Sequence, residues 1–292
     1  MIKTAIHFVS DFLHYENGMR LLEMICLKNA KPIDAISIFD RGFHYGDGCF
    51  TTARIRNNKI ELFERHLKRL NTAIERLSLQ ANLDYISESI QYLHQEYDQL
   101  NGTIKIVLSR GEGQRGYSLP HHSADLWLYY YPQNVTDHHY EVIVSGLLER
   151  AMGLTMPQLV GIKSLNRLEQ VLLKQEADEK GFQEALVTDV QGYIVEGISS
   201  NCFIRLNDTW ICPELRYNGV HGVMRAEILE RMNHYGITFQ KRVIDLNELP
   251  HIQSVFYCNA LHPMKIASCL DDRRLDTQAC IDLFHYLQLN QI

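Results

Sequence analysis

Strand-like and helix-like segments follow one another along this chain without regular alternation, and this order limits the fold more than any other feature. Apolar residues at helical spacing predict helices over residues 63–79, 85–100, 164–180 and 222–235. Short alternating segments predict strands between them, and Asn57-Asn58 predicts a hairpin turn. A doubly wound sheet requires strict strand and helix succession, so the order favours an α+β fold.

A loop without periodicity, residues 111–123, divides the chain. It holds glycines, prolines and histidines and separates a predicted strand at 103–109 from further strands at 126–131 and 140–145. We therefore expect an N-terminal α+β domain over residues 24–118 and a C-terminal α+β domain over residues 119–292.

Composition excludes several classes of function. The net charge is −6 with acidic and basic residues interleaved, so no basic stripe predicts nucleic-acid binding. The seven cysteines are scattered, without zinc-ligand spacing, which predicts reduced thiols in the cytoplasm and no metal site. No run of eighteen uncharged apolar residues predicts a membrane span, and charged or polar residues interrupt the N-terminal apolar stretch that resembles a signal peptide.

The string from Gly111 to Gly116 matches the glycine pattern of dinucleotide-binding loops. That pattern works because a helix begins at its last glycine and points its N-terminus at a pyrophosphate. Here Tyr117-Ser118-Leu119-Pro120 follows and predicts no helix, so we reject a nicotinamide cofactor.

Lys163 directly precedes the clearest predicted helix, residues 164–180. Ser164 is its expected cap, and its expected apolar face is formed by Leu165, Leu168, Val171 and Leu172. A lone lysine is usually a solvated surface charge. Apolar neighbours and the positive end of a helix dipole both disfavour the ammonium form, and this favours a neutral, reactive amine.

Two motifs resemble the signature of the fold-type IV pyridoxal-phosphate (PLP) enzymes. They are GIKSLNRLEQVLLKQEA at residues 161–177 and VEGISSNCF at residues 195–203. Further likeness lies in residues 40–42, 46–48, 66–70 and 222–225. The resemblance implies an α+β, two-domain enzyme with PLP between the domains, and a homodimer. Residues 1–23 have no counterpart and are expected to be an N-terminal extension, unless translation starts at Met24.

The resemblance also implies the roles of individual residues. Lys163 would carry the cofactor as a Schiff base, and Glu196 would lie against the pyridine nitrogen and keep it protonated. The phosphate would be bound by Arg69 and by backbone amides of Val223 and Met224. Further phosphate contacts are expected at two neighbouring positions, Asn259 and Ala260. On their own, Glu196 and Arg69 would be read as ordinary surface charges.

Four segments resemble the lyase branch of this family, the aminodeoxychorismate lyases. They are residues 46–54 with F-T-T-A-R, 109–117, 166–170 and 258–261. The implied reaction converts 4-amino-4-deoxychorismate to 4-aminobenzoate and pyruvate in folate synthesis. The substrate is a dicarboxylate, and we nominate Arg115 first and Arg110 second as its contacts. A D-amino-acid or branched-chain aminotransferase, and a PLP-binding scaffold without catalysis, remain as alternatives.

Overall fold

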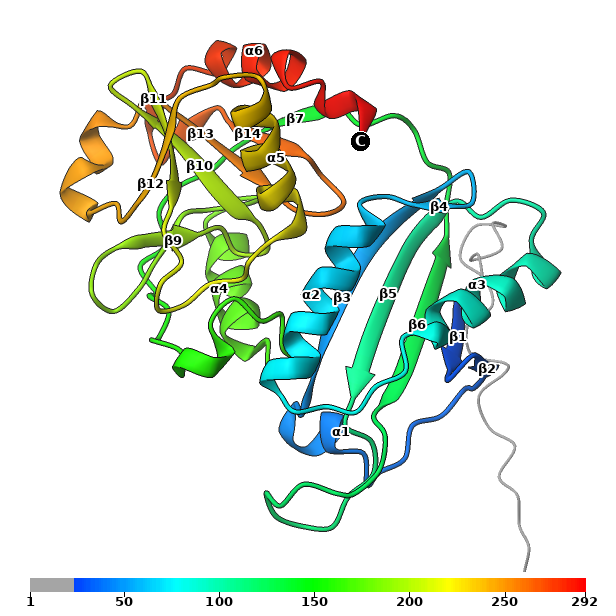
Figure 1. Cartoon of the computed structure of the whole chain (residues 1–292). Coiled ribbons are helices and arrows are strands. Elements are labelled where there is room, and N and C mark those ends of the chain that lie inside the picture. Colours follow the sequence, from blue (N-terminus) through cyan, green and yellow to red (C-terminus); the bar gives the residue numbers. More distant parts are fainter. Residues whose placement is uncertain (1–23) are drawn as a thin grey trace, which may run out of the picture.

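The computed structural model of the protein describes residues 24–292, and the expected N-terminal extension, residues 1–23, lies outside them. Two lobes lie side by side, each built on one six-stranded sheet (Figure 1). Helices and strands are mixed within both lobes, so the predicted α+β class is confirmed. Within the described residues, no helix combines the length and the apolar composition that a membrane span needs.

The first sheet has the order β2-β1-β6-β5-β3-β4, and all its neighbouring strands are antiparallel. Its strands are β1 (Ile25–Lys28), β2 (Lys31–Pro32), β3 (Gly48–Arg56), β4 (Lys59–Ile60), β5 (Gly102–Ser109) and β6 (Asp125–Pro132). Asn57 and Asn58 both have positive φ, so the predicted hairpin turn is confirmed. Residues 33–38 form no strand, although several of them are apolar, because the chain leaves the sheet after Pro32.

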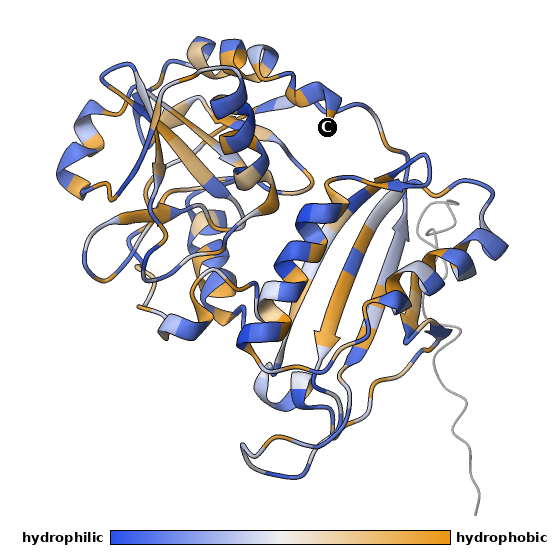
Figure 2. Cartoon of the chain, in the orientation of Figure 1, coloured by the Kyte–Doolittle hydropathy of each residue, from blue (hydrophilic) through white to orange (hydrophobic). Residues whose placement is uncertain are grey.

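Three helices belong to the first lobe: α1 (Arg41–Tyr45), α2 (Phe63–Arg76) and α3 (Asp84–Glu96). Helices α2 and α3 confirm two of the predicted helices. Leu70 and Leu93 are buried in one cluster with sheet residues such as Ile104, which provides the apolar burial that stabilises the lobe. Figure 2 shows hydrophobic residues along β5 and β10 and hydrophilic residues on the outer side of α2.

The second sheet has the order β12-β11-β10-β13-β14-β7. Its strands are β7 (Tyr140–Ile143), β10 (Asn201–Leu206), β11 (Thr209–Pro213), β12 (Phe239–Arg242), β13 (Ser254–Cys258) and β14 (Met264–Ala267). Two short hairpins accompany it: β8 (Val187–Thr188) with β9 (Ile194–Glu196), and β15 (Cys269–Leu270) with β16 (Arg273–Arg274). Its helices are α4 (Leu168–Glu179), α5 (Val223–His234) and α6 (Gln278–Tyr286). Short 3-10 turns cover Pro157–Leu159, Leu246–His251 and Leu289–Gln291.

Strand β6 belongs to the first sheet, although the expected boundary after residue 118 would assign it to the second domain. It pairs with β5 over eight positions, from Gly102 opposite Pro132 to Ser109 opposite Asp125. A division after residue 118 would break this pairing. We propose instead that the division falls in residues 133–139, and limited proteolysis that cuts elsewhere first would contradict this.

The two lobes meet where α2 packs beside α5 (Figure 1). Arg65 of α2 forms ion pairs with Glu227 (2.8 Å) and Glu230 (2.7 Å) of α5. Arg76, at the end of α2, donates a hydrogen bond to the carbonyl of Val160 (2.7 Å). These contacts hold the middle of α5 next to the first turn of α2, beside the candidate site.

Candidate active site

A cavity of about 1040 Å³ opens between the lobes. Its walls come from β3, α2, the segment before α4, α4 itself, the loop after β9, the start of α5 and the loop after β13. Lys163, Glu196 and Arg69 all line it, although the sequence separates them widely. The structure therefore brings together the three charged residues that the sequence motifs single out for the cofactor.

Lys163 lies on an extended segment between the two sheets, and not at a helix start. The backbone N–H of Phe50 donates to the Lys163 carbonyl (2.9 Å), and that of Leu165 donates to the carbonyl of Gly48 (3.1 Å). On its other side, Gly161 forms a bridge to Val220. These contacts hold the backbone of Lys163 against both lobes.

Two expectations about this segment are wrong. Helix α4 begins at Leu168 and not at Ser164, because residues 161–165 pair with strands instead. The expected apolar face also fails: Leu168, Val171 and Leu172 of α4 are exposed, and its buried residues are Leu173, Glu176 and Ala177. The helix dipole is therefore not what favours a neutral Lys163 amine.

Burial, together with the positive charges of Arg69 and Arg167, lowers the pKa of the Lys163 amine from 10.5 to about 8. Its Nζ atom lies 4.9 Å from the centre of the Phe50 ring. At pH 7 roughly a tenth of such an amine is uncharged, far more than of an ordinary lysine, and the uncharged form is the one that can attack a carbonyl carbon. The chemistry expected of Lys163 therefore has a local physical cause.

Glu196 is the last residue of β9, and its side chain is buried. It belongs to the second sequence motif, whereas Lys163 belongs to the first. Its Oε2 accepts hydrogen bonds from the Asn201 side-chain amide (3.0 Å) and the Val220 backbone N–H (3.0 Å). Burial raises the pKa of Glu196 to about 7, against the lowering effects of the Val220 hydrogen bond and of Lys163. A buried carboxylate of this kind gains most from a cationic N–H partner inside the cavity.

The loop that follows Glu196 is organised by Glu184, a residue that the sequence did not single out. Its carboxylate accepts from the backbone of Ile198 and Ser199 and from the hydroxyls of Ser199 and Ser200. Ser200 in turn accepts from the Asn259 side-chain amide (3.1 Å). No local pattern distinguishes Glu184 from a surface glutamate, because its partners lie fourteen or more residues away in the chain.

Arg69 is held in the cavity wall by its neighbours on α2 and β3. Its guanidinium donates to the Thr51 hydroxyl, and Thr51 is in turn 2.6 Å from Nδ1 of the buried His66 ring. The Thr51 hydroxyl and His66 Nδ1 share one hydrogen bond, and the tautomer of His66 decides which atom donates it. The Nε atom of Arg69 is buried and has no partner among residues 24–292.

This arrangement predicts a specific acid sensitivity. Burial, together with the charge of Arg69, lowers the His66 pKa from 6.5 to about 3. Between these values the unfolded chain binds more protons at this position, so the His66 contribution to stability is complete above about pH 6.5 and is lost as the pH falls toward 3. As the pH falls, we expect the free energy of unfolding to decrease more steeply in the wild type than in His66→Gln, by up to about 1.4 kcal/mol per pH unit.

The measurement is chemical denaturation at several pH values between 7 and 4. His94→Gln, at an exposed position on α3, is the matched control and should follow the wild type. If His66→Gln and wild type lost stability in parallel as the pH fell, the proposed neutral His66 would be wrong.

The N-terminus of α5 also faces the cavity. Gly222 and Val223 line it, and no side chain caps the helix, so the first backbone N–H groups have no helical partners. A Cβ atom at Gly222 would lie only 2.0 Å from Oδ1 of Asn201, so only glycine fits there. The Met224 side chain is buried in the core, and its backbone belongs to this first turn.

The residues present fit a phosphate-bearing pyridine cofactor. An unpaired guanidinium N–H on Arg69 and an uncapped helix start on α5 both suit a dianion. Asn259 and Ala260 line the same cavity. Lys163 supplies an amine for an aldehyde, and Glu196 a carboxylate for a protonated ring nitrogen. The individual roles of these residues remain predictions.

The two arginines nominated for the substrate do not line the cavity. Arg110 is buried, and its guanidinium donates to Asp47 (2.8 Å) and to the carbonyls of Ser78 (3.1 Å) and Leu77 (2.6 Å). It therefore stabilises the turn after α2 rather than facing a ligand in this cavity. Arg115 lies on the exposed loop after β5, so its role remains a prediction. As expected, no helix follows Gly116.

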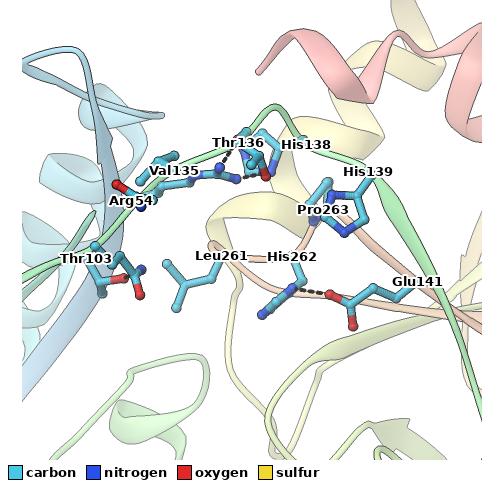
Figure 3. A pocket seen from close by; sticks show the side chains of 12 residues that line it. Arg54, Thr103, Val135, Thr136, His138, His139, Glu141, Leu261, His262 and Pro263 are labelled. Carbon is cyan, nitrogen blue, oxygen red and sulfur yellow. Dashed lines mark hydrogen bonds and ion pairs between the residues drawn. The ribbon is translucent and has the colours of Figure 1, made fainter. Parts of the chain in front are cut away.

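A smaller cavity of about 380 Å³ lies beside the segment that connects the lobes, and Leu261 borders both cavities (Figure 3). Its polar side chains already satisfy one another. Arg54 donates to the carbonyl of Thr136 and lies 2.9 Å from Nδ1 of His138, and His262 pairs with Glu141 (3.0 Å). We therefore read this cavity as the packing of the connecting segment.

Known proteins resemble this chain over most of its length. A family model described as "Amino-transferase class IV" matches residues 48–269. An aminodeoxychorismate lyase of Vibrio harveyi is 31% identical over 242 residues, which cover 80% of this chain and 86% of the relative. A D-alanine aminotransferase of Bacillus licheniformis is 23% identical over 254 residues, with 84% and 86% covered. The crystal structure of 4-amino-4-deoxychorismate lyase from Pseudomonas aeruginosa superimposes with a TM-score of 0.77 at 32% identity, covering 89% of this chain and 98% of that one.

Proposed function

This chain belongs to the class IV aminotransferase family of PLP-dependent enzymes, and we propose that within this family it is an aminodeoxychorismate lyase. The proposed reaction converts 4-amino-4-deoxychorismate to 4-aminobenzoate and pyruvate, a step of folate synthesis. The expected fold type and cofactor are confirmed by the family. The choice of reaction is our inference.

The observation that carries the choice is the sequence of β3 where it enters the cavity. Phe50 and Thr52 line the cavity, and they belong to the F-T-T-A-R segment that resembles the lyase branch. Aminotransferase members usually carry an aromatic residue followed by a glutamate after the preceding G-D-G, whereas in this chain Thr51 follows Phe50. The similarity to two lyases over most of the chain supports the same reading.

Lys163 has two tasks in the proposed mechanism. It would hold the cofactor covalently, and its neutral Nζ, once free, would remove the proton from the amine-bearing ring carbon of the substrate. When bound, PLP supplies an electron sink for the pair released from that C–H bond. The ring-carbon bond to the ether oxygen then breaks, the ring becomes aromatic, and the Lys163 ammonium donates its proton to the departing enolpyruvyl group.

The other residues bind and orient. Glu196 holds a proton on the pyridine nitrogen. The hydrogen bonds from Asn201 and Val220 keep its carboxylate in position for this task. We propose that Arg69 and the amides of Val223 and Met224 bind the phosphate, with Asn259 and Ala260 beside them. A dianion in this position would give the buried Nε of Arg69 its missing acceptor.

The experiment that tests the reaction measures pyruvate release from 4-amino-4-deoxychorismate by the purified holoenzyme, without any keto-acid acceptor. We expect stoichiometric pyruvate and 4-aminobenzoate. An aminotransferase would instead require a keto acid and would transfer the amino group to it. Transfer of an amino group from D-alanine or leucine, with no pyruvate released from aminodeoxychorismate, would favour the aminotransferase. Bound cofactor with neither activity would favour the scaffold.

We also propose that the enzyme is a cytoplasmic homodimer. All seven cysteines are free, as suits a reducing compartment. Large apolar side chains are exposed near α1 and on α4, among them Phe39, Phe43, Leu168 and Val171. Exposed apolar groups of this size mark association surfaces. Sedimentation equilibrium that finds a monomer at micromolar concentration would contradict the dimer.

A further inference from the structure

The cavity contains a second guanidinium for which the proposed mechanism has no use. Arg167 lines the cavity just before α4, on the same wall as Gln170 and Val171. Its Nη2 donates to the Ser164 hydroxyl (3.0 Å), which fixes the direction of the side chain. Its Nε is buried and has no hydrogen-bond partner among the described residues.

A buried guanidinium N–H without an acceptor is costly, so its persistence here points to an acceptor that the chain itself does not supply. Arg167 forms no ion pair with any carboxylate in residues 24–292, and nearby Glu169 instead accepts from the backbone of Gly153 (3.1 Å). With the phosphate assigned to Arg69 and the start of α5, we take the substrate to be the acceptor for Arg167, since Arg167 lines the same cavity.

A carboxylate is the acceptor that a guanidinium fork fits best, because two parallel N–H groups match its two oxygens. We propose that Arg167 binds a carboxylate of the substrate, in the place where the sequence led us to expect Arg115 or Arg110. This inference rests on the proposed function only for the identity of that substrate. Such a contact would make the cavity selective for molecules that carry a carboxylate in addition to the reacting amine.

The test compares acids with their uncharged amides in calorimetric titrations of the holoenzyme. The ligand pairs are 4-aminobenzoate with 4-aminobenzamide, and pyruvate with pyruvamide. We expect the wild type to bind at least one acid roughly 10- to 100-fold more tightly than its amide, as a charge-assisted hydrogen bond implies. In Arg167→Gln this preference should disappear, and Arg167→Lys should restore part of it.

Arg216→Gln is the matched control, because Arg216 is exposed and forms its ion pair with Glu214 outside the cavity. It should keep the wild-type preference. Arg167→Gln should retain its bound cofactor, and loss of the cofactor would mean that Arg167 serves the cofactor and would overturn the proposal. An acid preference that survives in Arg167→Gln, or is absent in wild type for both pairs, would also overturn it.

The two proposals fail in different ways. If wild type releases no pyruvate from aminodeoxychorismate but loses its acid preference on Arg167→Gln, the lyase assignment is wrong and Arg167 still binds a carboxylate. If pyruvate is released and the acid preference does not depend on Arg167, the lyase stands and the carboxylate has another partner.

Discussion

Replacement of Lys163 by alanine is expected to abolish turnover and covalent attachment of the cofactor together. The loss of a positioned base alone accounts for about 10²- to 10⁴-fold in rate, and the loss of the covalent link adds to this. Borohydride reduction of the wild-type holoenzyme followed by peptide mapping should label Lys163, and reduction of Lys163→Ala should label no lysine in the cavity.

Two variants separate this effect from a general loss of structure. Lys59→Ala removes an exposed lysine on β4 and should retain full activity. Lys163→Arg keeps a positive charge at the site but cannot form the covalent link, so it should be as inactive as Lys163→Ala. Wild-type pyruvate release by Lys163→Ala, or labelling of a different lysine in the wild type, would remove the central assumption of the mechanism.

Glu196→Gln is expected to lower kcat by about 10- to 100-fold, with little change in overall stability. The amide occupies the same space, but it cannot hold a proton on the pyridine nitrogen as a carboxylate does, and a charged hydrogen bond of this kind is worth about 1.5–3 kcal/mol. The absorption spectrum of the bound cofactor should change with the protonation of its ring, and this readout does not depend on turnover.

Glu88→Gln, at an exposed position on α3, is the control for the chemical change and should resemble the wild type. Glu184→Gln tests a positioning effect, because Glu184 holds the loop between Glu196 and Asn201. It should weaken cofactor binding and leave the ring spectrum of the bound fraction unchanged. A Glu196→Gln enzyme with the kcat and spectrum of the wild type would show that Glu196 does not contact the ring nitrogen.

The helices and strands that depend on local pattern could be predicted, and those that depend on distant partners could not. Helices α2 and α3 follow from their apolar spacing, and the β3–β4 turn follows from Asn57 and Asn58. Residues 164–167 have a helical pattern, but Ser164 and Leu165 pair with β3, since tertiary contacts override local propensity. The exposed apolar face of α4 also could not be predicted, because the spacing of apolar residues does not distinguish a face buried in the core from a face that binds another subunit.

The site shows a similar division. Lys163, Glu196, Arg69 and Val223 belong to continuous motifs, so the sequence marks them before any fold is known. Glu184 acts through partners fourteen or more residues away in the chain, and nothing near it in the sequence signals this. Thr51 and Asn201 lie inside the quoted segments, but their contacts with Arg69 and with the Val220 carbonyl span eighteen and nineteen residues. Arg110 shows the converse error: a loop arginine looked available for a ligand, but Asp47 and two backbone carbonyls occupy it.

The backbone pairing around Lys163 connects the cofactor site to the contact between the two lobes. Ser164 and Leu165 pair with β3, Gly161 bridges to Val220 just before α5, and ion pairs join α5 to α2. A ligand that binds only to the closed arrangement of the lobes stabilises it by RT ln(1 + [L]/Kd). We therefore expect cofactor bound in this cavity to make the whole chain harder to unfold.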